Sequence, residues 1–142
     1  MGRENTEVNA GFIRSFKELR VWQNAMDLAL EIFQLSKQFP ADERFSLTDQ
    51  IRRSSRSVAA NIAEGWRKRR YPASFVSKLS DADAEAGETQ TWLEFCRRFK
   101  YLDNGIVDSL DARYDEVLGQ LVSMMSHPEK WTVKQKDSEV RG

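Results

Sequence analysis

Apolar residues recur at steps of three and four along most of this chain, the spacing that gathers side chains on one face of an α-helix. The pattern is clearest in segment 47–66, whose apolar face consists of Leu47, Ile51, Ser54, Val58 and Ile62. Ser46 followed by Asp49 predicts the start of this helix through a capping box. Gly65 and then Pro72 predict its end.

An earlier segment is predicted to form a helix from Ser15, where Glu18 completes a capping box, to about Gln38, because Pro40 follows. Its thick apolar face consists of Leu19, Trp22, Ala25, Met26, Ala29, Ile32, Phe33 and Ser36. The turn that follows is flanked by Phe39 and Phe45. We expect these two rings to close the end of the domain.

Two further helices follow segment 47–66. The third is predicted to begin at Pro72, and its seam consists of Phe75, Leu79, Ala82, Ala86, Thr89, Leu93 and Cys96. The fourth follows Asn104 and Gly105, and its face consists of Val107, Leu110, Tyr114, Val117, Leu121 and Met124. Each repeats its apolar residues over several turns, so both should pack along their whole length.

No segment shows the alternating pattern that predicts a β-strand. Four helices with short links favour an all-α fold, an up-down-up-down four-helix bundle over residues 16–126. Residues 1–15 and 127–142 lack apolar periodicity and are largely polar, so we expect flexible tails at both ends.

A polar stripe accompanies the apolar face of segment 47–66 at the same helical step and consists of Gln50, Arg53, Ser57, Asn61 and Glu64. Residues of this kind ordinarily form a solvated face. Ser57 and Asn61, however, lie among alanines. We therefore expect a hydrogen-bonded seam against another helix, in the same subunit or in a neighbour, that holds the assembly together.

Charge is balanced overall, with 22 basic and 22 acidic residues, but it is unevenly distributed. Residues 52–70 contain seven basic residues and one acid, whereas residues 81–94 contain five acids and no base. The two segments can pair within the chain, pair between subunits, or present charge to a ligand. Within the acidic segment, Glu85 and Glu88 are expected to meet Arg53 or Arg56.

The basic segment is also the candidate ligand surface, because the planar guanidinium group of arginine suits phosphate. Two aromatic residues, Trp66 and Tyr71, bracket the basic cluster at residues 67–70 and could stack on unpaired bases. The predicted nucleic-acid-binding residues are Arg52, Arg56, Trp66, Arg67, Lys68, Arg69, Arg70 and Tyr71. The alternative is a solvated run of charge that neutralises the acidic helix, and the residues alone favour neither.

The chain offers little for catalysis. Its one histidine, His127, lies at a helix end beside Pro128, and its one cysteine, Cys96, lies on an apolar seam. No Cys/His pair has zinc-site spacing, and the Glu-x-x-His motif of di-iron bundles does not occur. We predict no catalytic residues, no metal site and no cofactor.

Hydropathy gives an expectation about location. No segment approaches the roughly 20 apolar residues of a membrane span. The N-terminal residues contain no apolar run of signal-peptide length, and a single cysteine excludes an intrachain disulfide. We therefore expect a cytoplasmic protein that does not associate with membranes.

Several motifs occur together in this chain: Leu19-Arg20-Val21-Trp22-Gln23, Phe39-Pro40 with Glu43, Leu47 with Gln50-Ile51-Arg52-Arg53, and Asn61-Ile62-Ala63-Glu64-Gly65. A weaker match is Glu88-Thr89-Gln90-Thr91-Trp92-Leu93. In combination, over about residues 16–125, they resemble a bacterial family of four-helix-bundle proteins encoded within intervening sequences of 23S ribosomal RNA genes.

The resemblance implies an up-down bundle assembled as a homopentamer, without enzymatic activity. A related branch, the accessory proteins of diversity-generating retroelements, forms basic pentameric barrels that bind nucleic acid and a reverse transcriptase. This chain departs from the family pattern at Ser46, where glycine is usual, at Arg56, where a small or apolar residue is usual, and at Ala59, where proline is common. Its balanced charge also departs from the basic branch.

Together these observations predict a non-enzymatic, oligomeric four-helix bundle that binds RNA or DNA through a basic surface repeated around a ring. The expected partners are further copies of the chain, RNA or DNA, and, by resemblance, a reverse transcriptase. The alternative is a protein-interaction scaffold or accessory subunit that does not bind nucleic acid.

Overall fold

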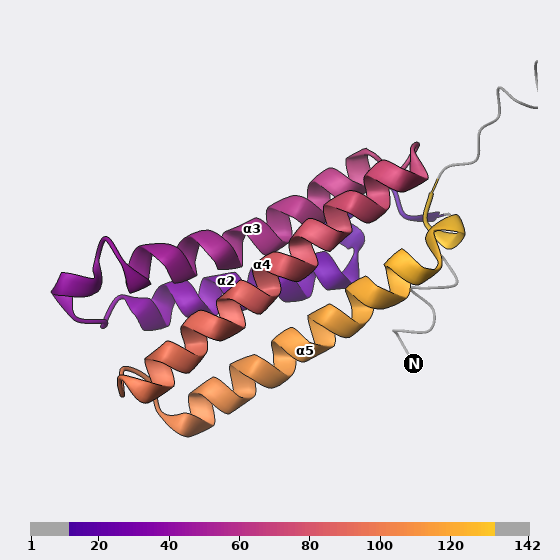
Figure 1. Ribbon diagram of the computed structural model, residues 1–142. Helices are drawn as coiled ribbons and strands as arrows, with labels where there is room; N and C mark the ends of the chain where they lie inside the picture. The colour runs from indigo at the N-terminus through magenta and orange to yellow at the C-terminus, as the bar shows by residue number, and fades with distance from the viewer. Residues whose placement is uncertain (1–11, 133–142) are drawn as a thin grey trace, which may run out of the picture.

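The computed structural model describes residues 12–132, which form four α-helices and no strand. The helices are α2 (Arg20–Ser36), α3 (Leu47–Arg67), α4 (Pro72–Arg98) and α5 (Asn104–Ser126). They lie side by side in one elongated bundle, in which each helix contacts the next and α2 contacts α5 (Figure 1). The predicted all-α class is confirmed.

The core consists of the apolar faces that the sequence predicts. Every residue of the faces predicted for α3, α4 and α5 is buried. In α2 the buried positions are Val21, Ala25, Leu28, Ile32 and Ser36. The stripe of Trp22, Met26, Ala29 and Phe33 is only partly covered. Helix α2 therefore has more apolar surface than its own chain covers.

The beginnings of two helices differ from the predicted capping boxes. Ser15 accepts a hydrogen bond from the Lys17 amide, but it caps a short 3₁₀ turn, η2 (Phe16–Glu18), and Leu19 is extended before α2 starts. For α3, the Ser46 hydroxyl donates to a Glu43 carboxylate oxygen at 2.7 Å and does not cap the helix. The same oxygen accepts from the Leu47 amide at 3.2 Å, so Glu43 supplies the cap.

The link between α2 and α3 contains a second 3₁₀ turn, η3 (Ala41–Glu43). Phe39 packs against Tyr101 with 5.7 Å between ring centres, which covers the end of the bundle as expected. Phe45 does not, because 84% of its surface is exposed. The expectation that both rings close the bundle is therefore wrong for Phe45.

Residues 127–132 differ from the flexible tail that the sequence predicts. They include the 3₁₀ turn η4 (Pro128–Lys130), which contacts α4 and α5, and they place Trp131 in the core. A single large aromatic ring gains enough from burial to fold a polar segment that has no apolar periodicity. Residues 1–11 and 133–142 of the predicted tails lie outside the described residues.

Candidate nucleic-acid interface

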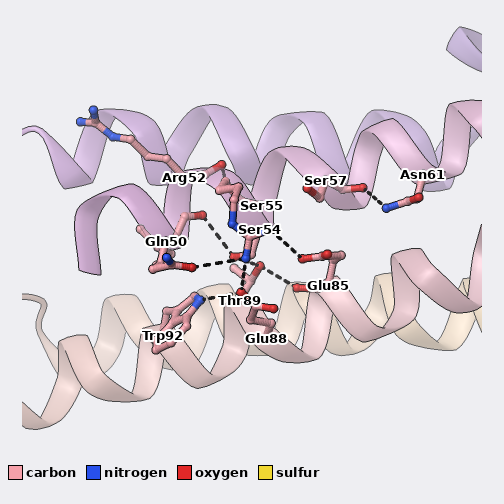
Figure 2. Close-up of polar contacts among 12 residues, drawn as sticks. Gln50, Arg52, Ser54, Ser55, Ser57, Asn61, Glu85, Glu88, Thr89 and Trp92 are labelled. Atoms are coloured by element: carbon pink, nitrogen blue, oxygen red, sulfur yellow. Dashed lines mark hydrogen bonds and ion pairs between the residues drawn. The ribbon is translucent and has the colours of Figure 1, made fainter. Parts of the chain in front are cut away.

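Arg52 and Arg56 lie one turn apart on the side of α3 that adjoins α2. Their guanidinium carbons lie 4.8 and 5.9 Å from the centre of the Phe33 ring. Arg52 Nε also donates a hydrogen bond of 2.7 Å to the Ser36 hydroxyl. Figure 2 shows the Arg52 side chain extending away from Glu88 and the α4 contacts. These contacts hold Arg52 in place and leave the remaining guanidinium donors available.

Arg52 and Arg56 line a groove of about 520 Å³ along α3. The complete lining consists of Arg44, Phe45, Thr48, Asp49, Arg52, Arg53, Arg56, Ser57 and Ala60. Four guanidinium groups therefore outnumber one carboxylate. The groove suits an anionic ligand.

The second part of the predicted interface lies at the C-terminal end of α3. Arg67 follows Arg56 by about three helical turns, so the two residues share one face of the helix. Lys68 and Arg70 are exposed. Arg69 folds back, and its guanidinium lies 4.0 Å from the Trp66 ring centre. Burial, followed by the charges of Arg67 and Arg70, lowers the pKa of Arg69.

The two aromatic residues predicted to stack on bases have different environments. Tyr71 is 58% exposed, so its ring faces solvent. Trp66 is only 3% exposed and belongs to the core, which corrects the prediction that its ring is available for stacking. Its spacing of four residues from Ile62 already indicated the apolar face. Sequence analysis did not propose Phe45 as a stacking residue, yet its ring is exposed and lines the basic groove.

Arg53 makes the main contact between the basic and acidic helices. Its guanidinium lies 2.6 Å from a Glu88 carboxylate oxygen and 3.9 Å from one of Glu85. Trp92 also donates to Glu88 (Figure 2). The expected contact of Glu85 and Glu88 with the basic helix is confirmed for Arg53. Across residues 12–132, no ion pair engages Arg52, Arg56, Arg67, Lys68 or Arg69.

Within the described range, no group of three or more His, Cys, Asp or Glu residues is arranged to hold a metal ion. No helix in that range is long and apolar enough to cross a bilayer. Cys96 is buried, and burial raises the pKa of its thiol to about 12. A thiol of this kind is a poor nucleophile because little thiolate forms.

Comparison with known proteins identifies the family. Residues 17–123 match the 23S rRNA-intervening sequence protein family. The chain belongs to this family. A solved structure, a protein of unknown function from the S23 ribosomal protein family of Bacteroides thetaiotaomicron VPI-5482, is similar with 31% sequence identity and a TM-score of 0.67. The similarity covers 74% of this chain and 97% of that chain. Among curated proteins, no match is found.

In this intervening sequence protein, several residues of the polar stripe of α3 make contacts within the subunit. Arg53 donates to Gln50 at 3.3 Å. Asn61 donates to the Ser57 carbonyl at 2.9 Å (Figure 2). Glu64 pairs with Lys78 of α4 at 2.7 Å, and this hydrogen bond raises the pKa of Lys78. Arg53 and Glu64 therefore contact a neighbouring helix of the same subunit, whereas the bond between Asn61 and Ser57 stays within α3.

The motif at residues 61–65 also marks a close approach of this protein's α3 to α4. A Cβ atom on Gly65 would lie 3.2 Å from a methyl carbon of Leu79 and 3.3 Å from Lys78 Cβ. Both distances are tighter than ordinary van der Waals contact. Glycine at this position therefore permits the two helices to pack closely.

The helix contact that sequence analysis missed is polar and buried. Ser54 of α3 and Thr89 of α4 share a hydrogen bond of 2.8 Å (Figure 2). Both are fully covered. Tyr114 of α5 is also fully covered, and burial raises its pKa. A serine and a threonine at core positions of facing helices were the available signal.

Proposed function

We propose that this protein binds RNA or DNA, without catalysing a reaction, through the basic surface of α3 and of the residues that follow it. One observation carries this proposal. Five basic residues of this surface have no carboxylate partner across residues 12–132, whereas Arg53 alone pairs with Glu85 and Glu88. A surface that served only to neutralise the acidic helix would pair with it more fully.

The arrangement of these residues suits a phosphate backbone. Arg52, Arg56 and Arg67 follow one face of α3 over about 22 Å, at 1.5 Å of rise per residue. The same basic surface continues past the end of the helix through Lys68, Arg69 and Arg70. Each phosphate that is neutralised releases counterions, so the affinity should fall steeply as the salt concentration rises.

We also propose that the chain forms an up-down-up-down bundle that assembles into a homopentamer. The supporting observation is an apolar groove of about 440 Å³ between α2 and α3, lined by Trp22, Met26, Ala29, Leu30, Phe33, Arg56, Ala59, Ala60 and Ala63. Met26 and Leu30 are 44% and 61% exposed. A second copy would cover the apolar side chains of this groove and leave Arg56, which borders both grooves, for phosphate. The alanines would let the helix of the second copy approach closely. Assembly would repeat the basic surface and multiply weak contacts.

Fluorescence anisotropy with labelled RNA and DNA, titrated against salt, tests nucleic-acid binding. We expect the double variant R52A/R56A to bind more weakly and to show a salt slope shallower by about one to two, one unit for each lost phosphate contact. Arg98→Ala is the matched control, because Arg98 is an exposed arginine of α4 that pairs with Glu94. Undetectable binding at low salt, or an equal loss in the control, contradicts the proposal.

Light scattering coupled to size-exclusion chromatography tests assembly. We expect the mass of five 16.5 kDa chains and a smaller species for Leu30→Lys, which would place a charge in the apolar groove. Val122→Lys is the control, because Val122 is half exposed on α5, away from the groove. A monomeric wild-type protein overturns the proposed assembly.

The alternative is a protein-interaction scaffold or accessory subunit, and the apolar groove also favours it. In that case a partner protein occupies the groove in place of a second copy. The retroelement resemblance makes a reverse transcriptase the partner to test. A monomer that binds no nucleic acid and binds this partner, with loss of binding in Leu30→Lys, supports the alternative.

A further inference from the structure

The basic groove of α3 has an exposed aromatic ring at its edge. Phe45 precedes α3 and is 84% exposed, the largest fraction among the large apolar side chains of residues 12–132. The Arg44 guanidinium carbon lies 5.1 Å from the centre of the ring. An apolar ring left in water carries a free-energy cost that a ligand covering it would remove.

The charged residues of the groove are close to this ring. Arg52 is held by Ser36 and Phe33, so little side-chain entropy is lost when its free donors bind an anion. Arg44 and Arg56 are exposed and have no ion pair within residues 12–132. Thr48 and Ser57 add hydroxyl groups, and Asp49 is the one carboxylate of the lining. The groove therefore combines an apolar ring with several hydrogen-bond donors that can bind phosphate.

We infer that this groove binds an unpaired nucleotide, with the base stacked on Phe45 and the adjoining phosphates bound by Arg52 and Arg56. The inference rests on the proposed function and names its substrate class, single-stranded RNA or DNA. An aromatic platform beside a basic groove is the combination that recognises single strands, because every unpaired base has a free π-face. In a duplex the bases are stacked on one another and present no such face.

Phe45 would supply the exposed stacking ring that the predicted interface lacks at this end of α3. Trp66, which the sequence suggested for this role, is buried. Tyr71 lies at the opposite end of α3 from Phe45, so it belongs to the other part of the basic surface. A phenyl ring has no hydrogen-bonding group, so the site should accept all bases with only modest preference.

Anisotropy with a labelled single strand and with a blunt-ended duplex of equal charge tests the inference. We expect tighter binding of the single strand and about a tenfold loss on Phe45→Ala, the effect typical of losing one stacked base. The salt slope should not change, because no phosphate contact is removed. Phe45→Trp should retain the affinity. Phe99→Ala, which removes a half-exposed ring at the C-terminal end of α4 that does not line the groove, should have no effect.

The outcomes separate this inference from the proposed function. If R52A/R56A weakens binding while Phe45→Ala does not, or if the duplex binds as tightly as the single strand, the inference fails and the proposed function stands. If neither nucleic acid binds at low salt, both fail. Circular dichroism checks that Phe45→Ala folds, as expected for an exposed side chain.

Discussion

The hydroxyl groups of Thr89 and Ser54 share a hydrogen bond of 2.8 Å that joins α4 to α3 inside the core. Both residues are completely buried. Thr89 also contacts the Glu85 carbonyl at 2.9 Å, whereas Ser54 has only a 3.4 Å contact with the Ile51 carbonyl besides Thr89. Without Thr89, the buried Ser54 hydroxyl would therefore lack a good hydrogen-bond partner.

Thr89→Val should lower the free energy of unfolding by about 1–2 kcal/mol, because it leaves the Ser54 hydroxyl buried without a good partner. Urea unfolding measures this difference. Thr91→Val is the matched control: Thr91 is exposed on the same helix and bonds only the Gly87 carbonyl. Its effect should stay within about 0.5 kcal/mol. Equal effects of the two variants would show that the contact between helices contributes nothing.

Glu43 links three parts of the chain and should make stability depend on pH. Its carboxylate accepts hydrogen bonds from the Ser46 hydroxyl, the Tyr101 hydroxyl and the Leu47 amide. The bond from Ser46, followed by that from Tyr101, lowers the pKa of Glu43 below 4.5. The ionised form is therefore favoured in the folded state. Its contribution is present above pH 4.5 and is lost as the pH falls through the lowered pKa.

Glu43→Gln should therefore be less stable than the wild type near neutral pH, and the difference should shrink as the pH falls below 4.5. Urea unfolding at a series of pH values measures it. Asp42→Asn is the control, because it removes the neighbouring charge and none of these hydrogen bonds. The Glu43 contact also raises the pKa of Tyr101 to about 12, so its absorbance titration should move to lower pH in Glu43→Gln. A difference that does not change with pH would contradict the assignment.

Gly65 and Gly87 should respond in opposite ways to alanine. Gly87 has open space where a Cβ atom would lie, so Gly87→Ala should raise the free energy of unfolding by about 0.5–1 kcal/mol through helix propensity. At Gly65 the added atom would meet Leu79 and Lys78 at 3.2 and 3.3 Å. Gly65→Ala should lower stability by about 1 kcal/mol, because overpacking outweighs the gain. Stabilisation by both variants in thermal unfolding would show that α3 and α4 separate easily.

Cys96 should react with thiol reagents only when the protein unfolds. The side chain is completely buried, and burial raises the pKa of the thiol to about 12. At pH 8 almost no thiolate exists in the native state, and the reagent cannot reach it. Labelling followed by mass spectrometry should show slow modification in buffer and complete modification in denaturing urea. Fast labelling in buffer would mean that the end of the bundle opens locally.

For α2, the sequence did not predict which apolar residues are buried. Its apolar residues form a face wider than one neighbouring helix covers, so periodicity predicted the helix without showing which stripe is buried. Val21 and Leu28 are in the core, whereas Met26 and Leu30 remain exposed. Both stripes keep helical spacing and consist of apolar residues. Only the packing of α3 and α5 against α2 decides between them.

Phe45 and Trp66 illustrate the same limit for the candidate site. Trp66 extends the step of four from Ile62, so helical spacing accounts for its burial. Phe45 lies in a turn before α3, where no periodicity applies. Its exposure follows from the path of the link between α2 and α3, which a linear pattern does not contain.

By itself, the sequence determined the all-α class, the approximate helix spans and the core faces of α3, α4 and α5, because these depend on local spacing and on the burial of apolar residues. It also indicated that the acidic and basic helices meet. The tertiary structure alone decided that Arg53 makes this contact, that Glu43 caps α3, and that Phe45 remains exposed beside Arg52 and Arg56. Those outcomes depend on how distant segments approach one another, and the free energy of such contacts exists only once the helices have packed.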